Sequence, residues 1–151
     1  MRTVTLADLP GLEGARLGSS SWQEISQDQI DEFADATGDH QWIHVDPERA
    51  AAGPFGCTIA HGYLTLSVIP VLLGDLLRVD GAVQAINYGL DTVRFPAPVP
   101  VDSRIRLTAT VEKVEQVTAG YQVAITASVE CDAGPKPACA ARLIYRFLGS
   151  I

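Results

Sequence analysis

Apolar and polar residues alternate along the second half of the chain, and this pattern predicts four long strands. They are Val83–Phe95, Arg104–Val117, Tyr121–Cys131 and Ala138–Leu148. Alternation is typical of strands because successive side chains point to opposite faces of a sheet. It is clearest in the third strand, where the apolar residues of one face are Tyr121, Val123, Ile125, Ala127, Val129 and Cys131. Strands in direct succession indicate an antiparallel sheet.

Turn residues separate these strands. Ala119-Gly120 fits a tight turn, so the second and third strands are expected to form a hairpin. The proline-rich segment PAPVPVD, residues 96–102, breaks the chain between the first and second strands, because proline cannot donate to a strand ladder.

A helix is predicted nearer the N-terminus, after a short strand at Ser21–Ile25. Ser26 and Gln29 form a capping box at its start, in which each side chain satisfies a free backbone N–H. Ile30, Phe33, Ala34 and Thr37 follow at helical spacing, and acidic residues lie on the other side. Gly38 is suited to end the helix, because glycine readily adopts the left-handed conformation that such a cap requires.

The next segment, DHQWIHV, has no clear period and is interpreted as a loop. Asp46-Pro47 then predicts the start of a second short helix, with a capping carboxylate and a proline at the first helical position.

A third segment, YLTLSVIPVLLGDLL, is apolar on nearly every side and predicts a helix that is buried all round. Pro70 lies inside it and is expected to kink it. One antiparallel sheet curled around this helix would bury both, which is an α+β arrangement. The sequence has no internal repeat or low-complexity linker, so residues 1–151 are expected to form a single domain.

Composition and charge exclude several classes of function. The chain is 47% hydrophobic and 19% charged, which is typical of a globular protein. A net charge of −7 makes a nucleic-acid partner unexpected. The three cysteines have no metal-site spacing and cannot all pair within one chain, so reduced thiols in a cytoplasmic protein are expected. Neither a signal peptide nor a membrane span is expected.

Titratable residues are concentrated in the segment from Gly38 to His44, between two capped helices. Asp39 and His44 are five residues apart, so an irregular loop could bring them to one water molecule. A carboxylate and an imidazole supply what hydration needs, one group that takes a proton and another that delivers one. The alternative is that Asp39 only follows a helix end and that His44 only packs.

Two other candidates depend on the fold. His40 and His44 form an HxxxH pair that His61 could complete as a zinc triad, but that pair needs a helix, so no metal is expected. Gly62 stands where the chain enters the apolar helix, and its N–H could bind developing negative charge. Gly62 could equally just permit close packing.

The segment FADATGDHQWIHVDPERAAA resembles the signature of the MaoC-like, R-specific enoyl-CoA hydratase family. The pattern of an aromatic residue, Gly-Asp, an aliphatic residue, His and a small residue is filled by Phe33, Gly38, Asp39, Ile43, His44 and Ala50. Ile59-Ala60-His61-Gly62 resembles the second motif of this family. The resemblance covers nearly the whole chain, from Ser19 to Phe147.

This resemblance implies a hot-dog fold, an antiparallel sheet wrapped around a long central helix, usually paired as a homodimer with a continuous sheet. It implies that Asp39 and His44 activate water and that the Gly62 N–H holds the thioester carbonyl. Gln41, Trp42 and His61 are expected to contact the substrate. No cofactor is expected, and the substrate is an acyl-CoA or an acyl thioester on an acyl carrier protein.

The expected reaction is R-specific hydration of trans-2-enoyl-CoA, or the reverse dehydration. A hot-dog thioesterase and a non-catalytic acyl-thioester-binding subunit are the alternatives. The chain departs from the family at two points, with Gln41-Trp42 where members often carry Asn-Pro, and Pro70 where some carry serine. Both departures leave the preferred acyl chain open.

Overall fold

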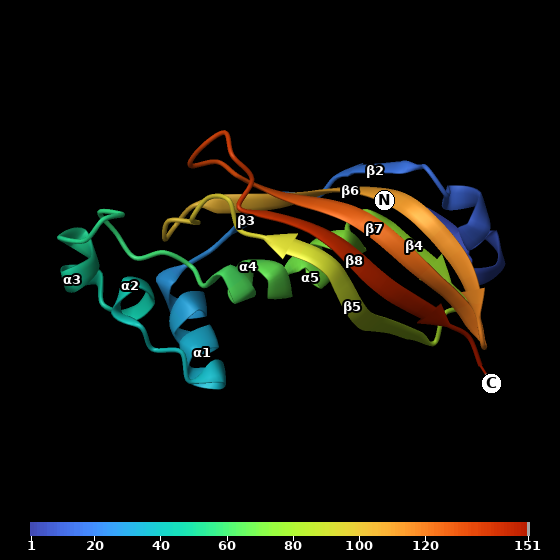
Figure 1. Ribbon diagram of the computed structural model, residues 1–151, viewed down its shortest axis with the longest axis horizontal. Coiled ribbons are helices and arrows are strands. Elements are labelled where there is room, and N and C mark those ends of the chain that lie inside the picture. The colour runs from blue at the N-terminus through green and yellow to red at the C-terminus, as the bar shows by residue number, and fades with distance from the viewer. Residues whose placement is uncertain (151) are drawn as a thin grey trace.

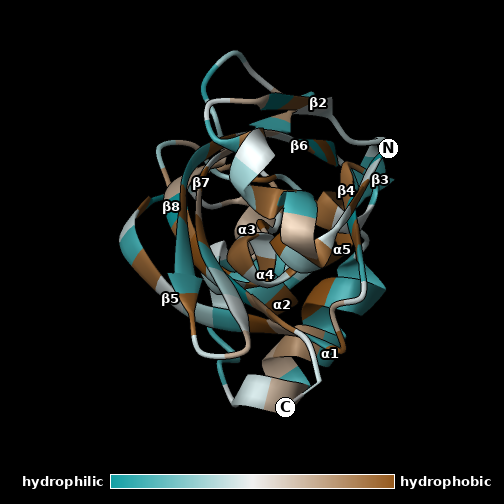
Figure 2. Ribbon diagram, turned by 90° about the vertical axis from the view of Figure 1, so that its right-hand side faces the viewer, coloured by the Kyte–Doolittle hydropathy of each residue, from teal (hydrophilic) through white to brown (hydrophobic). Residues whose placement is uncertain are grey.

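The computed structural model describes residues 1–150, and its centre is a curved antiparallel sheet (Figure 1). The strand order is β2-β6-β7-β8-β5, with β3 also pairing with β6. The bounds are β2 Arg16–Ser19, β3 Gln23–Glu24, β5 Gln84–Arg94, β6 Arg104–Val117, β7 Gly120–Cys131 and β8 Cys139–Leu148. The sheet curls around two helices, α4 (Gly62–Ser67) and α5 (Ile69–Gly74), as Figure 2 shows. The predicted α+β arrangement is confirmed.

All four long strands lie where the alternation predicts them, with ends that differ by at most one residue. The hairpin between β6 and β7 is also confirmed. Its turn residues are Thr118 and Ala119, one position earlier than predicted, because Val117 pairs with Gly120. Ala119 takes a left-handed φ of 66°, which a two-residue hairpin loop favours.

The inner face of the sheet forms the core with α4 and α5. Ile105, Leu107, Val111, Val123, Ile125 and Val129 all have fully buried side chains. The outer face carries cross-strand ion pairs such as Arg106–Glu130. Cys131 and Cys139 are buried and, like Cys57, form no disulfide. Burial raises the pKa of the Cys139 thiol to about 11.

The apolar helix differs from its prediction in two ways. It is divided into α4 and α5 at Val68, because Pro70 lacks the N–H that would bond to the Leu66 carbonyl. It is also not buried all round, since Tyr63 and Val71 are 69% and 63% exposed. The sheet covers only one side of this helical segment, so the side chains on the opposite side of the segment are exposed to solvent.

The N-terminal residues form elements that the alternation did not indicate. Strand β1 (Arg2–Thr5) pairs in parallel with β4 (Leu77–Asp80), and the 3-10 helix η1 (Leu6–Leu12) follows it. Leu9 and Leu12 of η1 are buried in the core. Within residues 1–150, no helix is long and apolar enough to span a bilayer.

Three helices, α1 (Gln27–Thr37), α2 (Trp42–Val45) and α3 (Pro47–Ala51), lie beyond one end of the sheet (Figure 1). The Ser26 hydroxyl caps α1 by accepting from the Gln29 N–H at 3.2 Å. Only this half of the predicted capping box is present among the described residues. Asp46 caps α3 as predicted, accepting from the Arg49 N–H at 3.0 Å.

Candidate active site

The Gly38–His44 segment leaves α1 through a left-handed turn and then re-enters a helix. Gly38 has φ 82° and its N–H donates to the Ala34 carbonyl at 2.8 Å, the predicted C-cap. The interpretation of DHQWIHV as a loop is wrong for its second half, which forms the single turn α2. That turn buries His44 while Asp39 stays exposed in the preceding loop.

His44 is held in one tautomer by its surroundings. It is 6% exposed, and its Nδ1 lies 2.7 Å from the Ile59 carbonyl oxygen. A carbonyl only accepts, so Nδ1 carries the hydrogen and Nε2 keeps its lone pair. Burial, with a smaller effect of His61, lowers the pKa of His44 below its ordinary value, against the opposing effects of Ile59 and Asp39. His44 is therefore a neutral potential base near neutral pH.

The backbone around His44 is held by a network that the sequence did not indicate. Gln27 donates from Nε2 to the His44 carbonyl at 2.7 Å, and its Oε1 accepts from the Thr58 hydroxyl. The Ile59 N–H donates to the Ile43 carbonyl at 3.0 Å. A glutamine in the first turn of a helix has no local pattern that would mark it as part of a site.

His61 lies behind His44 and is 3% exposed. Its ring stacks on the His44 ring, with centroids 3.8 Å apart and planes at 21°. Phe33 packs against it from α1 at 4.9 Å. Its Nε2 lies 2.9 Å from the Asp39 carbonyl oxygen. Unlike His44, His61 does not line the pocket that contains Gly62, so the structure gives no support to the expected direct contact between His61 and the substrate.

Asp39, His44 and His61 form one cluster, with one nitrogen or carboxylate oxygen from each lying within 4.8 Å of the others. His40 lies outside it, exposed and paired with Asp35 at 2.9 Å, a bond that raises the pKa of His40. The His40–His44–His61 triad is therefore not assembled. In the assembled cluster, the His44 and His61 rings are stacked, and the lone pair of a ring nitrogen lies in the plane of its ring. Two lone pairs in near-parallel planes do not point to a common position, which is unfavourable for binding one metal ion.

Gly62 begins α4, and its N–H donates to no group within residues 1–150. It lines a pocket of about 270 Å³ together with His44, Phe55, Ile59, Thr65, Phe95 and Val99. A Cβ at Gly62 would lie 3.1 Å from the Phe95 ring, so glycine allows this ring to pack closely. The structure thus brings His44 and the Gly62 N–H, 18 residues apart in sequence, to one pocket.

Gln41 and Trp42 lie at the outer side of this cluster. The Gln41 N–H points to Asp39 Oδ1 at 3.4 Å, and the Gln41 side chain is exposed. The Trp42 ring lies under the Arg49 guanidinium, 4.4 Å from its centroid, and against Gly53. Neither residue lines the pocket that contains His44 and Gly62.

A family model described as a MaoC like domain matches residues 10–132, which include the whole cluster. The chain belongs to the MaoC-like family. One curated relative in Mycobacterium tuberculosis, 3-hydroxyacyl-thioester dehydratase Z, is 53% identical over 150 residues, covering 98% of this chain and 99% of the relative. A 3-hydroxybutyryl-CoA dehydratase of Methylorubrum extorquens is 36% identical over 107 residues, 71% of this chain and 66% of the relative.

Solved structures show the same fold for this MaoC-like chain. An R-hydratase from Pseudomonas aeruginosa superposes with a TM-score of 0.76 at 24% identity, over 97% of this chain and 87% of the other. An (R)-hydratase from A. caviae gives a TM-score of 0.73 at 22% identity, over 89% and 96%. The predicted family and the hot-dog fold are confirmed.

Proposed function

We propose that this protein is a hydro-lyase that interconverts (R)-3-hydroxyacyl and trans-2-enoyl thioesters. The observation that carries the proposal is a pocket lined by His44, whose imidazole has a free Nε2, and by Gly62, whose N–H has no partner within residues 1–150. A carboxylate oxygen of Asp39 lies within 4.8 Å of a ring nitrogen of His44. The similarity to two dehydratases that act on 3-hydroxyacyl thioesters supports the same reaction class.

In the hydration direction, Asp39 and His44 hold one water molecule against C3 of the enoyl group. Nε2 of His44 accepts a proton as the water oxygen bonds to C3, and C2 takes up a proton from the Asp39–His44 pair. The electron pair of the double bond passes through an enolate-like state, whose negative thioester oxygen is held by the Gly62 N–H. The Asp39–His44 pair takes one proton from water and gives one to C2, so it ends in its starting protonation state. Dehydration reverses each step.

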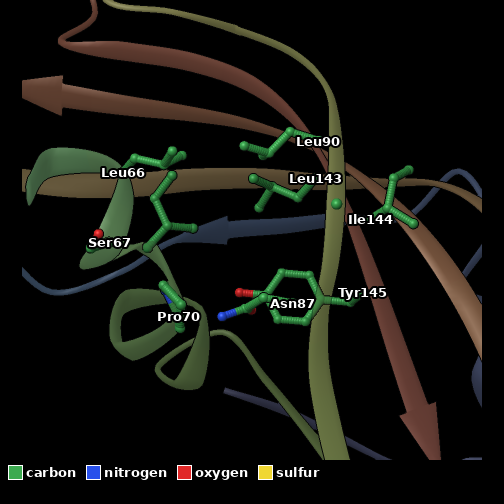
Figure 3. Close-up of a pocket in the computed structure, with 10 residues that line it drawn as sticks. Leu66, Ser67, Pro70, Asn87, Leu90, Leu143, Ile144 and Tyr145 are labelled. Carbon is green, nitrogen blue, oxygen red and sulfur yellow. The ribbon is translucent and has the colours of Figure 1, made fainter. Parts of the chain in front are cut away.

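A second hollow continues along the same helix and suits the acyl tail. Its volume is about 340 Å³, and it lies between α4–α5 and the strands β5 and β8. Leu66, Leu90 and Leu143 point toward one another in it, with Pro70 below them (Figure 3). Gly62 and Leu66 are one turn apart on α4, so we propose that a thioester held at Gly62 directs its tail along the helix toward this apolar space.

The proposal is tested by hydration of crotonyl-CoA, followed by the loss of enoyl absorbance. Water and proton both arrive from the Asp39–His44 side, so addition is syn, and the family resemblance assigns the R product. A dehydrogenase specific for the S enantiomer should leave the product untouched. No hydration of any enoyl thioester, whether on CoA or on an acyl carrier protein, would reject the proposed reaction, and complete oxidation by the S-specific enzyme would reject the substrate orientation.

We also propose that the protein forms a homodimer. Within residues 1–150, strand β5 pairs only with β8, so the backbone groups of its other edge are unpaired, and the strand carries the exposed side chains Ile86, Tyr88 and Leu90. An unpaired apolar edge suits pairing with the same strand of a second copy. Sedimentation should give a dimer at micromolar concentration, and a monomer would contradict it.

The unpaired cysteines suit the expected cytoplasmic location.

A further inference from the structure

We infer that His61 is a positioning residue, which holds Asp39 and His44 at a fixed separation without contacting the substrate. This role rests on the proposed function of Asp39 and His44. It differs from the substrate contact expected for His61, and it follows from three observations on the buried ring.

The first observation is that His61 contacts both members of the acid–base pair through different parts of its ring. A carbonyl oxygen only accepts, so the 2.9 Å contact requires that His61 Nε2–H donates to Asp39. The ring face meanwhile stacks on His44 at 3.8 Å. Asp39 is exposed on a loop and has no other contact that ties its main chain to the helix α4. His61 therefore sets the separation between the carboxylate loop and the His44 ring.

The second observation concerns the other ring nitrogen. His61 Nδ1 is buried and has no hydrogen-bond partner among residues 1–150. With the hydrogen on Nε2, Nδ1 carries a lone pair that no group within residues 1–150 meets. An unsatisfied buried acceptor still lowers stability. An apolar ring of similar size would avoid this cost, so stability alone does not explain a histidine here.

The third observation is the place of His61 in the chain. It directly precedes Gly62, whose N–H lines the pocket beside His44. Gly62, the proposed N–H donor for the thioester oxygen, therefore directly follows His61, the residue that positions Asp39 and His44. Movement of the His61 ring would displace Asp39 and His44 relative to Gly62, and small misplacements of reacting groups have large effects on rate.

Two variants separate this role from simple packing. His61→Phe keeps an aromatic ring for the stack but removes both nitrogens, whereas His61→Gln retains an amide N–H that can reach the Asp39 carbonyl. For hydration of crotonyl-CoA, His61→Phe should lower kcat by roughly 10- to 100-fold with KM changed by less than about threefold. His61→Gln should recover part of the lost kcat. The thermal midpoint of His61→Phe should stay close to that of the parent, because the variant loses one hydrogen bond and one unsatisfied nitrogen together.

The role is overturned if His61→Phe keeps kcat within about twofold of the parent, if its thermal midpoint falls together with kcat, or if His61→Gln is no better than His61→Phe. A readout that needs no turnover is nitrogen NMR of the imidazoles. The parent should show a hydrogen on His61 Nε2, and the backbone amide signals of residues 39–41 should shift in His61→Phe and return toward their parent positions in His61→Gln. Unchanged signals overturn the positioning role, whereas these shifts in a protein that hydrates no enoyl thioester would reject the proposed function alone.

Discussion

The sheet and the helical segment beyond its end, residues 26–62, are held in place by different means. Strands β6, β7 and β8 share long backbone ladders, and the side chains on their inner face are buried. The helical segment has few buried apolar residues, namely Ile30, Ala34, Ala50, Ile59 and Ala60. Its geometry depends instead on single polar bonds, such as Gln27 to the His44 carbonyl and His61 to the Asp39 carbonyl.

Because of this difference, the residues that determine the free energy of unfolding are not the residues that determine the catalytic rate. The sheet is held together by many similar contacts. One altered side chain there changes the free energy of unfolding without moving Asp39 or His44. In the helical segment, one lost bond removes little stability but changes the position of a reacting group. We therefore expect substitutions in the two regions to affect different measurements.

The largest effect on activity is expected from the acid–base pair itself. Asp39→Asn and His44→Gln are nearly isosteric, so each should lower kcat for crotonyl-CoA hydration by about 10²- to 10⁴-fold with little change in thermal midpoint. Asp35→Asn, an exposed carboxylate on α1, is the matched control and should retain parent activity. Retention of more than about a tenth of parent turnover in either site variant would contradict the assignment.

The largest effect on stability is expected in the sheet. Ile125 on β7 is fully buried, and Ile125→Ala should lower the free energy of unfolding by about 2–5 kcal/mol, with Ile125→Val costing about 0.5–1.5 kcal/mol. Denaturant unfolding measures both. The kcat of the folded fraction should stay within about twofold of the parent. A large loss of kcat in Ile125→Val would show that the two regions are coupled.

A smaller effect on activity is expected from the network behind His44. Gln27→Ala removes the donor to the His44 carbonyl and the acceptor for Thr58, so kcat should fall by about tenfold. Gln29→Ala is the matched control, since it alters the same residue type in the same turn of α1 and loses no side-chain hydrogen bond within residues 1–150. Equal losses in the two variants would assign the effect to the helix and not to the network.

The smallest expected effect is a shift in pH dependence. Protonation removes the lone pair of His44 Nε2, and burial holds the pKa of His44 below its ordinary value of 6.5. The kcat/KM for hydration should therefore stay level as pH falls to about 6.5 and decline only below it. Asp39 opposes this shift and His61 adds to it, so residual activity in Asp39→Asn should decline at still lower pH. A decline that begins above pH 7 would contradict the buried, neutral assignment.

Much of the fold could be predicted from local patterns. Strands β5–β8 were located from alternation alone, because a sheet with one buried face imposes a period of two on the sequence. The ends of α1 and the start of α3 were located from Ser26, Gly38 and Asp46, whose capping chemistry is local. The parallel pair β1–β4 was missed because each strand is four residues long, too short for a clear period.

The sequence by itself determined the four long strands, the helix caps, the family and the choice of Asp39, His44 and Gly62 as candidates. Only the tertiary structure decided that His44 lies in a helical turn, that His40 lies outside the cluster and that His61 is buried behind His44. The bonds that place these rings join residues 15 to 31 positions apart. No local pattern encodes such contacts, since they arise only when α1, α2 and the start of α4 pack together at the end of the sheet.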